Sequence, residues 1–275
     1  MNRRSIVWGL AVGAVVAVGV VGMHHAALAD AGEGEAAALQ PDAWMGPRAW
    51  VSSALEKVDL RDDQRAQLEL LRTDVTAQTV ALRAARDRLV DAVATSVEAG
   101  GALDHTTIDP LLAATQAAAL THRPVLESAA NRLHSILDSR QREQLISALH
   151  AQVFSHLHHG GSDHLAAMGA RLGLSDGQVA TLRARLVAAH EGEPGGGAEN
   201  MRAHLARARA LAAAFESESF DAGALGVGDH VTAMAAKAGK MLAHLDVALP
   251  VLTPAQRAEL GRVLRAGTSP ATPPT

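Results

Sequence analysis

The sequence predicts an all-α protein made of two tandem helical hairpin units, on the strength of three observations. Long stretches combine Ala, Leu, Arg, Glu and Gln with hardly any β-branched run, a composition typical of helices. Only 2% of the 275 residues are aromatic, so a core of Leu, Val and Ala between slender helices favours an elongated shape over a compact globule. The third observation is a nine-residue phrase, Leu-x3-Gln-x3-Leu, at four expected helix starts.

The four copies of this phrase form two similarly spaced pairs. Gln64 and Gln141 are 77 residues apart, and Gln178 and Gln256 are 78 apart. The matching intervals indicate that one unit of about a hundred residues occurs twice. A fifth copy centred on Gln116 has no capping residue before it, and we interpret it as a coincidence within a helix. The motif residues are Leu60, Gln64, Leu68, Leu137, Gln141, Leu145, Leu174, Gln178, Leu182, Leu252, Gln256 and Leu260.

Each copy of the phrase also carries residues that start helices. The side chains of Ser, Thr and Asp accept hydrogen bonds from the first free backbone N–H groups, and Pro fits the first helical position. The phrase is therefore expected to be a helix N-terminus, with its two leucines on one stripe of the helix. The expected capping residues are Asp59 or Asp62, Asp138 with Ser139, Ser175 with Asp176, and Thr253 with Pro254.

The first unit is expected to span residues 49–160 and to contain four helices. Gly100-Gly101 should end the long second helix, and Asp109-Pro110 should cap the third. Pro124 should bend that third helix, because Pro lacks the N–H that the helix needs. The expected ranges are about 50–57, 62–98, 110–136 and 138–158.

The second unit is expected to span residues 161–266 and to repeat this order. Here Glu193-Pro194 and the three glycines at 195–197 should interrupt what is one long helix in the first unit. The expected helices cover about 163–171, 176–190, a segment that ends near Phe215, 221–249 and 254–265. The two units together would form a covalent pseudo-dimer.

The ends of the chain indicate export. Arg3-Arg4 precedes an apolar stretch over 6–21, and Ala27-Leu28-Ala29 offers a cleavage site, so residues 1–29 are expected to be a signal peptide. The alternative is an uncleaved membrane anchor, and either one places the rest of the chain in the periplasm. Residues 30–48 look like a flexible tether, and residues 267–275, with three prolines, like a disordered tail. The absence of Cys excludes disulfides, thiol catalysis and cysteine metal sites.

The segment Leu252-Thr253-Pro254-Ala255-Gln256 resembles the L-T-x-x-Q motif of the Spy/CpxP family of bacterial envelope proteins, which includes ZraP-like zinc proteins and CnrX-like metal sensors. The copy at 174–178 is close to it, whereas the first two copies replace the Thr with Arg61 and Asp138. The resemblance covers about residues 50–265. Family members usually have one unit and often dimerise.

The resemblance implies a non-enzymatic envelope stress protein. Such a protein would act as an ATP-independent chaperone for unfolded or misfolded envelope proteins, or as a partner of the periplasmic domain of a signalling protein. The sequence itself shows no phosphate-binding loop, no nucleophile elbow and no H-E-x-x-H motif. Its formal net charge of -4 and its few aromatic residues argue against nucleic-acid binding. A purely structural spacer is a third reading.

Arginines on the expected long helices are candidates for client binding. Arg65, Arg72 and Arg86 are separated by multiples of seven, and Arg202 and Arg209 repeat the interval. In Spy-like proteins a concave face that mixes cations with apolar residues holds unfolded clients, and such a face attracts acidic segments. The alternative is a solvated helix face paired with nearby carboxylates. The full candidate set is Arg65, Arg72, Arg83, Arg86, Arg202 and Arg209.

The chain has fourteen histidines, and four of them lie within 156–164. His156 and His159 would share a helix face, with His158 and His164 nearby, and imidazole binds zinc, copper, nickel or cobalt. The alternative is a polar joint between the units that happens to be rich in His.

A second candidate metal site follows from the CnrX-like members. In those sensors, His or Met on the short first helix meets a His on the third helix. The matching residues here are His164, Met168 and His244, with His190 as a substitute fourth ligand. Two family ligand positions hold Ala248 and Leu186 instead. The equivalents in the first unit, Trp50, Ala54, Thr76 and Ala129, carry no ligand, so the site would belong to the second unit alone. The alternative function is therefore a heavy-metal sensor or metal-buffering protein.

Overall fold

The computed structural model describes residues 51, 53–160, 169–190 and 198–266, and these residues form helices and turns without any strand. The expectation of an all-α protein is confirmed for this part of the chain. The helices are α3 (Asp62–Gln78), α4 (Val80–Ala99), α5 (His105–Ile136), α6 (Ser139–Gly160), α8 (Asp176–His190), α9 (Ala198–Glu216), α10 (Asp229–Ala248), the 3-10 helix η2 (Leu249–Val251) and α11 (Pro254–Ala266). Short helical pieces at 53–55 and 169–172 precede α3 and α8.

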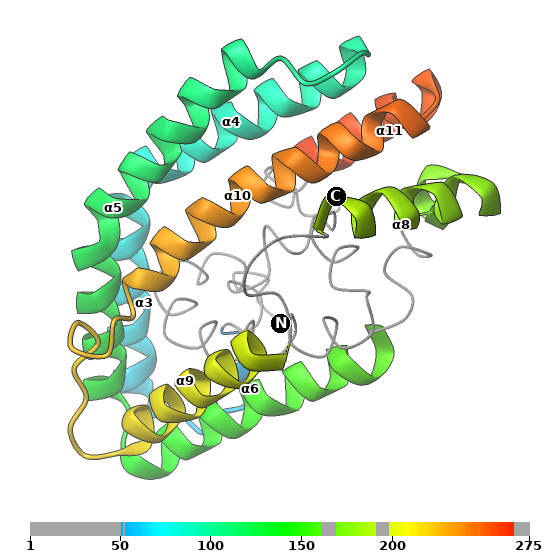
Figure 1. Cartoon of the computed structure of the whole chain (residues 1–275). Helices are drawn as coiled ribbons and strands as arrows, with labels where there is room; N and C mark the ends of the chain where they lie inside the picture. Colours follow the sequence, from blue (N-terminus) through cyan, green and yellow to red (C-terminus); the bar gives the residue numbers. More distant parts are fainter. Residues whose placement is uncertain (1–50, 52, 161–168, 191–197, 267–275) are drawn as a thin grey trace, which may run out of the picture.

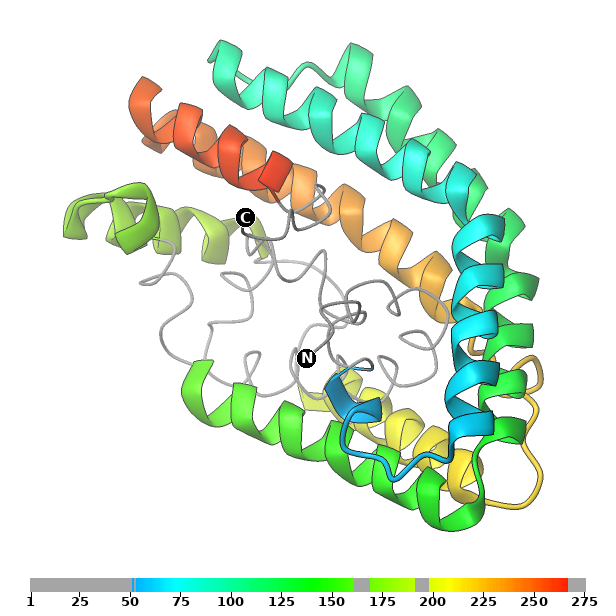
Figure 2. The same cartoon turned by 180° about the vertical axis from the view of Figure 1, so that it is seen from behind.

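The helices form a spine from which two arms diverge (Figures 1 and 2). The spine consists of α3 and the C-terminal half of α5, which pack against each other. In the upper arm of Figure 1, α4 packs on the N-terminal half of α5 and on α11, while α10 packs on α5 and α8. In the lower arm, α9 packs on α6. Consecutive helices α9 and α10 therefore lie in different arms.

The expected long helix over 62–98 is wrong, because the helix breaks at Thr79 into α3 and α4. Thr79 is fully buried, and its hydroxyl donates to the carbonyl of Val75, 2.7 Å away. A hydroxyl that bonds to the carbonyl four residues earlier tends to bend a helix. The guanidinium of Arg83 then donates to the carbonyl of Thr76, 2.6 Å away, which Val80 would serve in an unbroken helix. The bend lets the α3–α4 pair follow α5, which also turns along its length (Figure 1).

The expected cap at Asp109-Pro110 is also wrong, because α5 begins at His105 and contains both Pro110 and Pro124. Asp104 is the N-cap, and its carboxylate accepts from the backbone N–H of Thr107 and from both hydroxyls of Thr106 and Thr107. These donors lower the pKa of Asp104, first through Thr106. A carboxylate with three local donors is a better cap than Asp109.

The start expected for the next helix, Asp221, is displaced as well. Residues 222–228 form turns, and α10 begins at Asp229. The carboxylate of Asp221 accepts from the backbone N–H groups of Gly223 and Ala224. It thereby caps a local turn instead of a helix. Glycine is required within this segment, since Gly226 has a φ of 65° and a Cβ there would lie 2.5 Å from Asp229.

Two hydrophobic clusters hold the arms to the spine, and each combines residues from both sides of residue 160. The first joins 51–58, α3, the end of α5 and α6 to Leu211 and Phe215 of α9 and to the loop that follows. The second joins α4 and the start of α5 to Leu172, α10, η2 and α11. Each fully buried Leu contributes on the order of 1.5–3 kcal/mol. Two loops contribute residues to these clusters. Residues 100–104 form the first tip loop, which contributes to the second cluster, and residues 217–228 form the second tip loop, which contributes to the first cluster.

Within the described ranges, none of the helices has the length and apolar character needed to cross a membrane. The expected signal peptide at 1–29, the tether at 30–48, the interruption at 193–197 and the tail at 267–275 lie outside the described residues.

Candidate functional site

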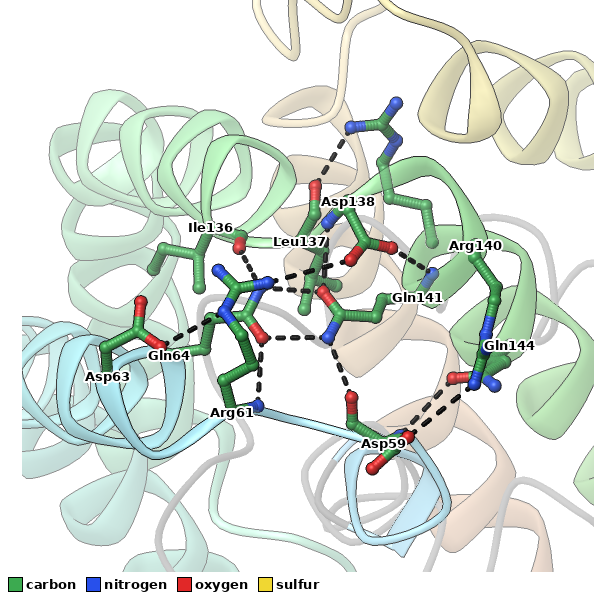
Figure 3. A network of polar contacts seen from close by, with 11 residues as sticks. Asp59, Arg61, Asp63, Gln64, Ile136, Leu137, Asp138, Arg140, Gln141 and Gln144 are labelled. Carbon is green, nitrogen blue, oxygen red and sulfur yellow. Dashed lines mark hydrogen bonds and ion pairs between the residues drawn. The ribbon is translucent and has the colours of Figure 1, made fainter.

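The motif glutamines Gln64 and Gln141 meet in a buried pair at the foot of the spine (Figure 3). Each side-chain amide donates to the other side-chain oxygen, at 2.7 Å and 2.8 Å. Gln64 also donates to the carbonyl of Ile136, and Gln141 donates to the carbonyl of Asp59, both at 2.7 Å. Each side-chain oxygen further accepts from the backbone N–H three residues earlier in its own helix, that of Arg61 or Asp138. Six hydrogen bonds therefore join the starts of α3 and α6.

Gln178 and Gln256 make the same six bonds at the starts of α8 and α11. Their amides donate to each other's oxygens at 2.8 Å and 3.2 Å. Gln178 also donates to the carbonyl of Val251, and Gln256 donates to the carbonyl of Gly173. The backbone N–H groups of Ser175 and Thr253 donate to the two side-chain oxygens. The two pairs therefore occupy equivalent local environments.

This pattern explains why the motif uses glutamine. Glu or Gln at the third helical position can accept from the N-cap backbone, which is one half of a capping box. Only Gln can also donate two hydrogen bonds across to the partner helix. A carboxylate at the same place would face the oxygen of its partner and a backbone carbonyl with no proton between them.

The expected N-caps are confirmed in three of the four copies. The N–H of each motif glutamine donates to the side-chain oxygen of Asp138, Ser175 or Thr253, which completes the capping box. In the first copy the prediction of Asp59 or Asp62 is wrong, since Arg61 is the N-cap of α3. The backbone carbonyl of Asp59 serves Gln141 instead, and its carboxylate lies 3.6 Å from Arg140.

An arginine follows the glutamine in three copies, and in two of them it reaches a tip loop. Arg257 donates to the carbonyls of Leu252, Leu249 and Gly101, and the last of these belongs to the first tip loop. Arg142 donates to the carbonyl of Leu137 and lies 3.6 Å from Glu218 of the second tip loop. The two arginines therefore fasten the two tip loops with different numbers of bonds.

A second pair of equivalent side chains holds the backbone of the tip loops. Asn131, ten residues before Gln141, accepts from the N–H of Ala222 at 2.8 Å. Asp246, ten residues before Gln256, accepts from the N–H of Leu103 at 3.3 Å. His105 lies between Asp109 and Asp246, at 3.0 Å and 2.8 Å, and these hydrogen bonds raise the pKa of His105. At the other loop, His134 contacts the carbonyl of Ser217 at 2.9 Å and lies against Phe215 and Phe220.

The candidate client-binding arginines have different partners. Arg65 and Arg209 are exposed, while Arg72 pairs with Glu69 and Arg86 pairs with Asp87. Arg83 is half-buried and binds the carbonyl at the α3–α4 break, which gives it a structural role. The side chain of Arg202 lies outside the described part. The row from Arg65 to Arg86 crosses the break at Thr79, so the structure does not keep it on one straight helix.

Most of the candidate metal ligands cannot be placed relative to one another. His244 is buried in α10. His164 and Met168 lie outside the described residues, and so do the side chains of His156, His158, His159 and His190. Among the side chains that the structure places, no three His, Asp or Glu residues are grouped so as to hold a metal ion.

Sequence reasoning missed the tip-loop contacts. The repeated Gln-Arg dipeptide was visible, and aligning the copies on their glutamines would also have paired Asn131 with Asp246. Comparison with protein-family models, curated proteins and solved structures finds no match for this chain.

Proposed function

We propose that this chain consists of two fused Spy/CpxP-like units and acts in the bacterial envelope as an ATP-independent chaperone. The observation that carries the proposal is the pair of equivalent glutamine networks, one in each proposed unit, 49–160 and 161–266. The glutamine of the L-T-x-x-Q motif is used in the same way in both halves, which supports a duplicated unit. The described helices and the diverging arms are consistent with a scaffold that offers extended surface.

The step from scaffold to chaperone rests on charge and apolar surface. Arg65 is exposed on α3, and Leu70 on the same helix is 63% exposed. Exposed apolar side chains beside cations can hold an unfolded segment weakly, with the charge speeding the encounter. A signalling partner in the periplasm could use the same surface.

The test is whether the chain without residues 1–29 slows aggregation of a chemically unfolded client in the absence of ATP. The expected result is suppression at equimolar or lower concentration that weakens as salt is raised. The triple variant Arg65→Glu, Arg72→Glu, Arg86→Glu should lose most of this suppression.

A matched control makes the same charge change at Arg140, Arg183 and Arg262, which are exposed on α6, α8 and α11. Equal loss in both triple variants would show that net charge, and not this surface, carries the effect. Full activity in the first triple variant would exclude those arginines as the client surface.

The second candidate function is metal sensing or buffering. The observation that favours it is that α6 continues as a helix to Gly160, so its backbone places His156 and His159 on one face. Equilibrium dialysis with zinc, copper, nickel and cobalt tests it. Binding should weaken as pH falls through about 6 to 6.5, because protonated imidazole cannot ligate.

Two variants separate the candidate metal sites. If His164→Ala with His244→Ala abolishes binding, the family-like site with Met168 and His190 is favoured. If removal of His156, His158 and His159 abolishes it instead, the ligands lie in the histidine-rich segment. If neither changes binding, the metal function is wrong.

A further inference from the structure

Arg257 contacts the first tip loop and Arg142 contacts the second, and these equivalent arginines make different numbers of hydrogen bonds. Arg257 satisfies three of its nitrogens with backbone carbonyls, and Gly101 of the first tip loop supplies one of them. Arg142 is more deeply buried, with a side chain only 7% exposed, yet it donates one hydrogen bond, to Leu137. In the part of the chain that the structure describes, its Nε has no hydrogen-bond partner.

The remaining contact of Arg142 is weak. Its Nη2 lies 3.6 Å from Glu218, beyond hydrogen-bond distance, and the Glu218 side chain is 92% exposed to solvent. Nε and Nη2 form one edge of the guanidinium, and on that edge Nε is buried without an acceptor while Nη2 faces Glu218 of the second tip loop. A buried charge whose donors are unmet favours any motion that lets water reach it.

The surroundings of the second tip loop allow such a motion. The loop connects α9 of the lower arm to α10 of the upper arm, and it lies across the end of the spine (Figures 1 and 2). Its twelve residues, 217–228, are held by backbone contacts of His134, Asn131 and Arg207. Phe220, Ala222, Leu225 and Val227 of the loop pack in the first hydrophobic cluster. The first tip loop is shorter, and three side chains bond its backbone: Arg257 donates to Gly101, Asp246 accepts from Leu103 and Ser96 accepts from Asp104.

We infer that the second tip loop opens locally while the first tip loop stays closed. The contact between Arg142 and the second tip loop sets the frequency of this opening. Release hydrates the Arg142 edge and uncovers apolar surface around Phe220 and Phe215, two of the three phenylalanines in the chain. The inference does not depend on the proposed function.

The absence of cysteine allows a direct test by thiol labelling. Ala222 and Leu103 are a matched pair of probes, because both are buried tip-loop residues whose N–H binds a side chain of the spine or of α10. In the full mature chain, the thiol of the Ala222→Cys variant should react at least tenfold faster than that of Leu103→Cys. Leu133→Cys, which is fully buried in α5, reports global unfolding and should be the slowest.

A second substitution tests the cause. Arg142→Met in the Ala222→Cys background removes the unmet Nε donor and should slow labelling at least threefold, with no change in the Leu103→Cys background. Hydrogen exchange of the unsubstituted chain provides an independent measurement, with faster exchange at the Ala222 amide than at the Leu103 amide. The inference is overturned if Ala222→Cys reacts no faster than Leu103→Cys, if all three thiols react at one rate, or if Arg142→Met speeds the labelling.

Discussion

The two glutamine pairs make the same six hydrogen bonds at different depths. Gln64 and Gln141 are only 1% and 4% exposed, while Gln256 is 9% exposed and Gln178 is half-buried. The first pair lies beside Leu68 and Leu145 of a cluster that also receives α9, so water cannot replace a lost partner. A motif repeated in sequence therefore repeats its geometry, while the energy that it contributes depends on what the rest of the chain packs over it.

The helices around the two glutamine pairs also differ in how they pack. In the first half, α3 and α4 follow α5 along its length, apart from the bend at Thr79. In the second half, α8 packs on α10 but α9 packs on α6 in the other arm. The helices that follow residue 160 are therefore divided between the two arms, and α9 covers α6.

The largest expected effect comes from replacing the buried glutamine. Gln64→Glu keeps the oxygen that accepts from Arg61 but loses both donors, and it places a carboxylate against two oxygens. We expect a loss of about 3–5 kcal/mol in the free energy of unfolding at pH 7. Gln178→Glu, in the shallower pair, should cost about 1–2 kcal/mol. Urea unfolding measures both.

Gln67→Glu, on an exposed position of α3, is the matched control and should change stability by less than about 0.5 kcal/mol. Equal losses at Gln64 and Gln178 would contradict the argument from depth.

The next largest effect is a difference in the free energy of unfolding between variants of Arg257 and Arg142. Arg257→Met removes one donor from each of three carbonyls, of which only that of Leu249 is known to keep another, the N–H of Leu252, and it should cost about 1–3 kcal/mol. Arg142→Met removes a buried cation whose Nε has no partner, so it should change the free energy of unfolding by about 1 kcal/mol or less, in either direction. Thermal and urea unfolding of the two variants provide the comparison. A larger loss of stability for Arg142→Met than for Arg257→Met would contradict the expected order.

The smallest expected effect is the pH dependence of the first tip loop. Asp109 and Asp246 raise the pKa of His105, so its protonated form is favoured in the folded state. This stabilisation is complete below about pH 6.5, the usual histidine pKa, and is lost as pH rises through the raised folded pKa. His105 is exposed and screened, so the difference in Tm between the protein and His105→Asn should shrink by roughly 1–2 °C from pH 5.5 to 8.5.

The second tip loop offers the contrast for this measurement. Asn131 occupies the place of Asp246 there and carries no ionisable group, so an Asn131→Ala variant should lose stability by the same amount at both pH values. A difference that grows with pH for His105→Asn would show that the sign is wrong.

The sequence predicted the starts of α6, α8 and α11 because capping depends on residues within four positions of each other. Asp138, Ser175 and Thr253 bind the backbone of their own helix, and this chemistry can be read locally. Two capping signals compete at the start of α5. Asp109 precedes a proline, but Asp104 is the cap because its carboxylate accepts from the hydroxyls of Thr106 and Thr107.

By itself, the sequence determined the all-helical class, most helix ends and the repeated glutamines at equivalent positions, because these follow from composition, capping and spacing. Only the tertiary structure decided that the glutamines pair, that Arg83 closes a break at Thr79 and that α9 joins α6. Tertiary contacts in this fold join residues up to 174 positions apart, as in the ion pair of Arg265 with Asp91. A distant partner is selected by which surfaces bury the most apolar area and leave the fewest polar groups unmet, and no local pattern encodes that choice.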